Sequence, residues 1–198
     1  MSLPIYKVVI DEEGLGIDKI SLVEYPAVEC NFLTFSKEEK KVLLSIDNEE
    51  QRIITGVVAR CDYPIYRRED NGYEYYIVFD RELIKQMAIK MLSDNHQNNI
   101  NIEHKPNSDV EGVEMLELYI KDSERGINPK GFDDISNGSL MVTYKVFNDE
   151  VWQSVKNGTY KGFSLEGVFV MEKTETNEER TLNEIMSMLD ELDKIIKK

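Results

Sequence analysis

The sequence predicts an α+β domain that is rich in short strands and is followed by a C-terminal amphipathic helix. Three observations support this prediction. Short segments of β-branched and aromatic residues recur between clusters of Gly, Pro, Asn and Asp. Helical spacing of apolar residues is rare before the C-terminal region, and one long apolar stripe with that spacing lies at the C-terminal end. Hydrophobic residues make up 41% of the 198 residues, which is enough for a core and argues against a disordered chain.

The strands are expected where β-branched and aromatic residues are concentrated between turn residues. Their expected ranges are 4–10, 19–25, 53–60, 73–79, 100–104, 113–120, 140–147 and 161–171. A turn is expected over 11–14, and the intervals 62–72 and 121–137 are expected as loops.

Two helices are expected inside the domain. The first covers 81–92, because Asp80 is a good N-cap and the apolar residues behind it recur at helical spacing, namely Leu83, Ile84, Met87 and Met91. Asp149 is expected to cap a shorter helix through Val151, Trp152 and Val155, which ends at Asn157-Gly158.

The domain is expected to cover residues 1–173, and residues 174–198 form a linker and the terminal helix. Residues 35–52 are rich in acidic and basic side chains, so this interval is expected to be an exposed connector or a mobile segment, with the compact part starting near Ile53. The apolar stripe of the terminal helix runs through Leu182, Ile185, Met186, Leu189, Leu192, Ile195 and Ile196. It has no partner in the neighbouring sequence, so docking on the domain, pairing with a second copy and continuation into a longer element all stay open.

Charge and composition exclude several classes of function. The formal net charge is −14, which repels phosphate backbones and argues against nucleic-acid binding. No apolar run is long enough for a transmembrane helix, and the N-terminus lacks the features of a secretory signal. Two cysteines, Cys30 and Cys61, do not form a disulfide framework and fit a reducing cytosol. No phosphate-binding glycine loop occurs, and no cofactor is expected.

His104 and Ser164 are the candidate base and nucleophile. In an extended segment, Ile100, Ile102 and His104 share one face, so the histidine is either a hydrogen-bonded strand-end residue or a partly buried general base. Ser164 and Glu166 share a face between Gly162 and Gly167, which is either an ordinary polar strand face or a nucleophile beside a carboxylate and backbone donors.

Two other chemistries are weaker. The acids and histidines Asp94, His96, Glu103, His104 and Asp109 are close in sequence but lack the spacing of a metal site, so no metal is expected. Cys61 with His104 would make a cysteine nucleophile, although a buried inert thiol is the simpler interpretation.

Several segments together resemble the prohead maturation proteases of tailed phages, most closely the XkdF-like phage serine proteases. They are Ile20–Ala27, Gly56–Ile84, Ile102-Glu103-His104, Gly138-Ser139-Leu140 and Trp152–Gly167, with the stretch Asn157–Gly167 as the most telling. The resemblance covers about residues 4–171. It implies a fold like that of the herpesvirus capsid proteases, a mixed and mostly antiparallel β-barrel with surrounding helices, and it implies that the histidine precedes the serine.

The resemblance also implies a catalytic set, with Ser164 as nucleophile and His104 as base. Herpesvirus relatives use a second histidine after the serine, but this chain has no histidine after position 104. An acid is the expected substitute, and Glu166 is preferred. Glu103, Asp109, Glu172, a residue of the terminal helix, or a dyad with water in the third place stay open.

The implied function is a serine endopeptidase of a tailed phage or prophage. It would cleave scaffold and major capsid proteins, and itself, during prohead maturation, inside the assembling prohead in the host bacterial cytoplasm. A homodimer or higher oligomer is left open, and neither nucleic acid nor a membrane is expected as a partner. The alternatives are a non-catalytic capsid-assembly or scaffold interaction module that keeps the fold, and a small metal-dependent hydrolase.

Overall fold

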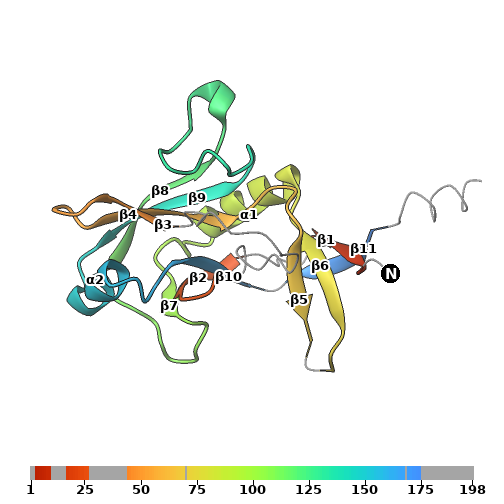
Figure 1. Cartoon of the computed structure of the whole chain (residues 1–198), viewed down its shortest axis with the longest axis horizontal. Helices are drawn as coiled ribbons and strands as arrows, with labels where there is room; N and C mark the ends of the chain where they lie inside the picture. Colours follow the sequence, from red (N-terminus) through yellow and green to blue (C-terminus); the bar gives the residue numbers. More distant parts are fainter. Residues whose placement is uncertain (1–2, 10–16, 27–43, 70, 168, 175–198) are drawn as a thin grey trace, which may run out of the picture.

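The structure is a computed structural model that describes residues 3–9, 17–26, 44–69, 71–167 and 169–174 (Figure 1). Its first elements along the chain are β1 (Ile5–Val9), β2 (Ile17–Val23), β3 (Leu44–Asn48), β4 (Ile53–Ala59), β5 (Ile65–Arg68), β6 (Glu74–Val78) and α1 (Arg81–Ser93). They are followed by β7 (Ile100–Ile102), β8 (Val113–Ile120), the short 3-10 helix η2 (Ser123–Arg125), β9 (Leu140–Val146), α2 (Asp149–Lys156), β10 (Gly162–Gly167) and β11 (Val170–Lys173).

The described strands form three sheets, with the orders β11-β1-β6-β5, β10-β2-β7 and β3-β4-β9-β8. The pairs β1–β6 and β2–β7 are parallel, and the other pairs are antiparallel. The prediction of a mixed, mostly antiparallel α+β fold is therefore confirmed. The barrel is not confirmed, because the ladders of the described residues form separate sheets and do not close on themselves.

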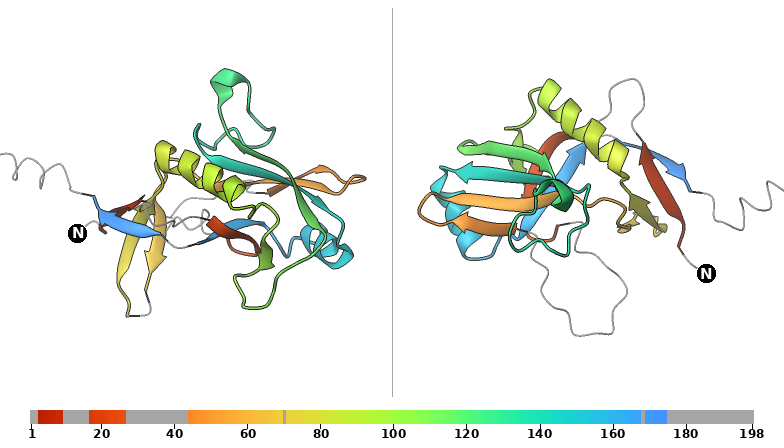
Figure 2. Two further views of the ribbon diagram at one scale, coloured as in Figure 1. Left: turned by 180° about the vertical axis from the view of Figure 1, so that it is seen from behind. Right: turned by 90° about the horizontal axis from the view of Figure 1, so that it is seen from above.

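Much of the core lies between the sheet β3-β4-β9-β8 and the sheet β10-β2-β7, and the same cluster of buried residues extends to α1, α2 and the sheet β11-β1-β6-β5. Strand β10 packs against β4, and the fully buried rings of Phe163 and Tyr144 have their centroids 5.5 Å apart. Figure 1 shows the sheet β11-β1-β6-β5 to one side of these two sheets. In the right-hand view of Figure 2, α1 bridges the two regions along one side of the molecule.

The first predicted helix and its cap are confirmed. Asp80 Oδ1 accepts a hydrogen bond of 2.7 Å from the Leu83 N–H, as an N-cap residue does. The predicted apolar positions Leu83, Ile84, Met87 and Met91 are all buried. The second helix was also expected, but its N-cap is Asn148, not Asp149, because the Asn148 side chain accepts from the first free backbone N–H groups.

Three expectations about the strands need correction. The interval 161–171 is not one strand, because β10 ends at Gly167, after a bulge between Glu166 and Gly167, and β11 joins a different sheet. The loop expected over 62–72 contains β5, which pairs with β6. The connector expected over 35–52 contains β3, which pairs with β4.

The compact part does not start near Ile53, since β1 and β2 belong to two of the sheets. The rest of the expected connector, 35–43, lies outside the described residues, as do the expected turn over 11–14, Cys30 and the terminal helix.

Candidate active site

Ser164 lies on β10 at the end of a pocket. Antiparallel pairing of β10 with β2 places Ser164 directly opposite Ser21, and parallel pairing of β2 with β7 places Ser21 beside Asn101. Ser21 and Asn101 are 0% and 2% exposed, whereas Ser164 is 7% exposed and lines the pocket. Of these three neighbouring polar residues, Ser164 is therefore the one that a ligand in the pocket can contact.

His104 is carried by a turn that follows β7. Glu103 and His104 both have left-handed backbone conformations, with φ of 55° and 53°. Residues other than glycine rarely adopt this conformation. The turn is fixed to β2, because the Glu103 N–H donates to the Leu22 carbonyl (3.1 Å) and the Glu24 N–H donates to Glu103 Oε1 (2.6 Å). Consecutive strained residues of this kind are often found at functional sites.

This turn corrects the predicted orientation of His104. Strand alternation placed His104 on the face of Ile100 and Ile102, but the strand ends at Ile102 and the left-handed turn reverses the side on which the imidazole lies. The ring is instead on the face of Asn101, where Nδ1 lies 2.8 Å from Ser21 Oγ and 3.5 Å from Glu166 Oε2.

The hydrogen bonds around Nδ1 determine which ring nitrogen carries the proton. The Glu166 carboxylate only accepts, so the amide nitrogen of Asn101 donates to Glu166 Oε2 (2.6 Å) and the amide oxygen faces Ser21. Ser21 Oγ donates its single hydrogen to that oxygen. It can then only accept from His104, so Nδ1 carries the hydrogen, and Nε2 of the neutral ring carries the lone pair.

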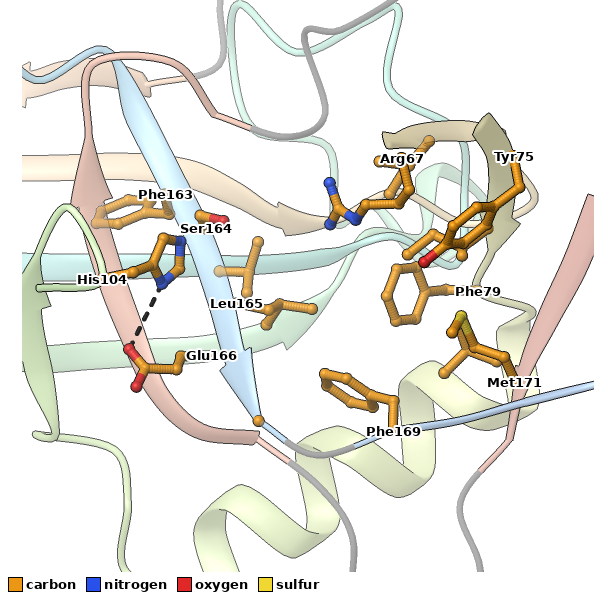
Figure 3. A pocket seen from close by; sticks show the side chains of 15 residues that line it. Arg67, Tyr75, Phe79, His104, Phe163, Ser164, Leu165, Glu166, Phe169 and Met171 are labelled. Carbon is orange, nitrogen blue, oxygen red and sulfur yellow. Dashed lines mark hydrogen bonds and ion pairs between the residues drawn. The ribbon is translucent and has the colours of Figure 1, made fainter. Parts of the chain in front are cut away.

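The second ring nitrogen is on the side of Ser164. In the view of Figure 3, one ring nitrogen is directed toward Ser164 and the other faces Glu166. His104, Ser164 and Glu166 line the same pocket, although no hydrogen bond joins His104 to Ser164 in the described part of the chain. Such a contact is often long before a substrate binds.

The other candidates for a third group lie elsewhere. Glu103 accepts from the backbone of Glu24, and Asp109 forms a 2.5 Å ion pair with Lys19. Glu172 is exposed on β11 and is not among the residues that line the pocket. Glu166 is therefore the carboxylate that the fold places at the imidazole, among the acidic residues that the structure describes.

The remaining chemical candidates do not meet at this site. His96 contacts the Ile17 carbonyl through Nδ1 at 3.1 Å. Cys61 is buried, and burial together with a hydrogen bond to Asp62 raises the pKa of its thiol to about 11, which disfavours the thiolate. No group of three or more His, Cys, Asp or Glu side chains is placed to share a metal ion within the described ranges.

Sequence reasoning missed Ser21 and Asn101 as members of this cluster. Each is a polar residue between two isoleucine or leucine neighbours on a strand, so its side chain leaves the apolar face. That local signal marks a polar strand face, but it does not reveal that segments 80 residues apart meet there.

Comparison with known proteins identifies the family of this chain. Residues 40–174 match the family model described as "Putative phage serine protease XkdF". The chain belongs to this family. The matched range includes His104, Ser164 and Glu166. Strand β2, which carries Ser21, precedes the matched range. No curated protein and no solved structure matches the chain significantly.

Among the described residues, none of the helices has both the length and the apolar character needed to cross a lipid bilayer.

Proposed function

We propose that this member of the XkdF phage serine protease family is an endopeptidase that cleaves scaffold and major capsid proteins, and itself, during prohead maturation. Ser164 is the nucleophile, His104 the general base and Glu166 the carboxylate that orients the base. One observation carries the proposal most directly. The contacts of Ser21 and Glu166 with Nδ1 support a lone pair on Nε2 of His104, and His104 and Ser164 line the same pocket.

In the acylation step, Ser164 Oγ attacks the carbonyl carbon of the peptide while His104 Nε2 takes the hydroxyl proton. The imidazolium that forms is stabilised by Glu166 on the Nδ1 side. His104 then gives the proton to the leaving amine, the C–N bond breaks, and an acyl-enzyme remains. A water molecule, deprotonated by the same nitrogen, hydrolyses the acyl-enzyme and restores Ser164.

The oxyanion needs donors near Ser164, and the pairing of β10 supplies a candidate. The Ile20 N–H and the Leu22 carbonyl form hydrogen bonds with the backbone at the two ends of β7. The backbone groups of Ser21, which lies between them, therefore face the opposite neighbour, β10, where Ser21 pairs with Ser164. By alternation along β10, the Leu165 N–H points away from β2. It is the backbone donor that we assign to the oxyanion, a role in which one donor is worth about 3–4 kcal/mol.

The proposal is tested by co-expressing the full chain with the scaffold and major capsid proteins of the same phage genome. We expect discrete cleavage products that disappear in the S164A and H104A variants. S123A is the matched control, because Ser123 is exposed in η2 and away from the pocket. Cleavage at the original rate by S164A would overturn the proposal. The non-catalytic assembly module would be favoured by a different pair of results. The unaltered protein would then cleave neither partner, and proheads would fail to assemble when the protein is left out.

A further inference from the structure

The pocket that contains Ser164 is polar at one end and apolar over most of its lining. Its volume is 560 Å³, and the three sheets all contribute to it. The polar end holds Ser164, His104 and Glu166. The other end is formed mainly by apolar and aromatic side chains from β1, β4, β5, β6 and β11 and from the segments that adjoin them, together with Arg67 of β5. The apolar and aromatic residues are Val8, Val58, Ile65, Tyr75, Ile77, Phe79, Phe169 and Met171.

The aromatic side chains give this end a defined shape. Phe79 and Phe169 pack edge to face with their ring centroids 5.9 Å apart, and Figure 3 shows both rings, with Met171, facing Leu165 across the pocket. A charged group without a partner is costly in such surroundings, whereas a large apolar side chain would lose its contact with water at little cost. Most of the lining at this end therefore favours an apolar occupant, and Arg67 adds one cationic side chain to it.

The backbone of β10 offers a place for the rest of a peptide. Five consecutive residues, 163–167, line the pocket, whereas a strand that presented only a face would contribute alternate residues. The pocket thus runs along the edge of β10. In the described part of the chain, this strand pairs with β2 alone, and the backbone groups of Phe163 and Leu165 point away from β2. An extended peptide can pair with such an edge as an added strand.

We propose that the pocket is a specificity subsite for a large apolar substrate residue, such as Leu, Met or Phe, next to the cleaved bond. The substrate peptide lies as an additional strand along the outer edge of β10. Its scissile carbonyl is then at Ser164, and the neighbouring side chain enters between Leu165, Phe79 and Phe169. This inference rests on the proposed peptidase function, and it adds the class of residue that the enzyme recognises.

The subsite is tested with the purified full chain and a library of peptides made by digesting a bacterial proteome. Cleavage sites are read by mass spectrometry, and a fluorophosphonate probe reports separately whether Ser164 is reactive. We expect labelling of Ser164 and enrichment of Leu, Met and Phe at one fixed position beside the cleaved bond. Met171 is 44% exposed and lines the pocket, so M171E should fold while placing a carboxylate in the subsite.

M171E should lower kcat/KM for an apolar peptide by about tenfold or more, and should improve cleavage of the same peptide with Lys at that position. L116E is the matched control, because Leu116 is 54% exposed on β8 and does not line the pocket. It should leave both values unchanged.

The two proposals fail in different ways. If the probe labels Ser164 but cleavage shows no apolar preference, or M171E and L116E behave alike, the subsite is overturned and the peptidase stands. If the probe does not label Ser164, the proposed function is overturned and the subsite with it.

Discussion

Ser21 and Ser164 are directly opposed residues in the antiparallel ladder between β2 and β10, yet their surroundings differ. Ser21 is fully buried and hydrogen-bonded to Asn101 and His104, whereas Ser164 lines the pocket. One hydroxyl is therefore suited to hold the imidazole, and the other is available to a ligand. This division of roles leads to the first two predictions.

Replacing Ser21 by alanine should impair the base without disturbing the fold. The S21A variant loses the acceptor of the Nδ1 hydrogen, so the ring is no longer held in one tautomer. We expect kcat/KM for peptide cleavage to fall by roughly 10- to 100-fold. T55V is the control, since it removes a buried hydroxyl that contacts Thr143 at 2.9 Å, away from the pocket. Equal activity of S21A and T55V would argue against this role of Ser21.

Replacing Glu166 by glutamine should act mainly on kcat. The E166Q side chain can still accept from Asn101, but it no longer stabilises the positive charge that forms on His104 during catalysis. A fall of about tenfold or more in kcat is expected, with little change in KM. Steady-state kinetics measure this split, with E117Q, whose residue bonds Thr143, as the control. An unchanged kcat would mean that water or another group fills this place.

Asp80 should contribute stability that disappears in acid. Burial tends to raise the pKa of Asp80, but hydrogen bonds from Lys7 and from the Leu83 N–H outweigh it and hold the pKa below its usual value. A lowered pKa means that this stability is present above the pKa of the unfolded chain and is lost as the pH falls through the folded value. D80N keeps a good N-cap and removes the charge.

Urea unfolding at pH 7 and at pH 3 measures the effect of D80N. We expect the variant to be less stable by about half a kcal/mol at pH 7, because Lys7 is half exposed and such pairs are weak. The difference should shrink at pH 3. A difference of the same size at both pH values would show that the charge of Asp80 is not its cause.

Of two glycines with similar backbone angles, Gly138 and Gly126, replacement of Gly138 should cost more stability. Gly138 has a φ of +93°, and a Cβ there would lie 2.9 Å from the Cys61 sulfur, whereas Gly126 has a φ of +78° and open space around that position. G126A should cost about 1 kcal/mol of unfolding free energy for the left-handed backbone alone. G138A should cost about 1–3 kcal/mol more because of the clash. Equal losses in thermal unfolding would contradict the packing around Cys61.

Local patterns predicted the elements that depend on neighbours in sequence. Asp80 and the apolar spacing behind it predicted α1. Alternation predicted that Ser164 and Glu166 share a face of β10. This agrees with the structure, in which Ser164 pairs with Ser21 and Glu166 accepts from Asn101, the neighbour of Ser21. The bulge between Glu166 and Gly167 and the change of sheet between β10 and β11 were not predicted, although a glycine inside a strand pattern is a recognised sign of a bulge.

The placement of His104 and Ser164 at the same pocket could not be predicted from such patterns. It depends on β2, which lies between β7 and β10 in the sheet although it precedes both in sequence. The resemblance to phage proteases paired the two residues, but it did not reveal Ser21 and Asn101 between them. The face of His104 was predicted wrongly because alternation assumes an extended backbone, and Glu103 and His104 leave it.

The most direct measurement is the mass-spectrometric location of a fluorophosphonate adduct on the purified full chain. Trypsin cleavage after Lys161 and Lys173 yields a peptide in which Ser164 is the only hydroxyl-bearing residue, so the assignment is unambiguous. We predict an adduct on this peptide that forms with the unaltered protein and is nearly abolished in H104A. An adduct on the peptide that contains Ser21, or equal labelling of Ser164 in H104A, would contradict the pairing of His104 with Ser164.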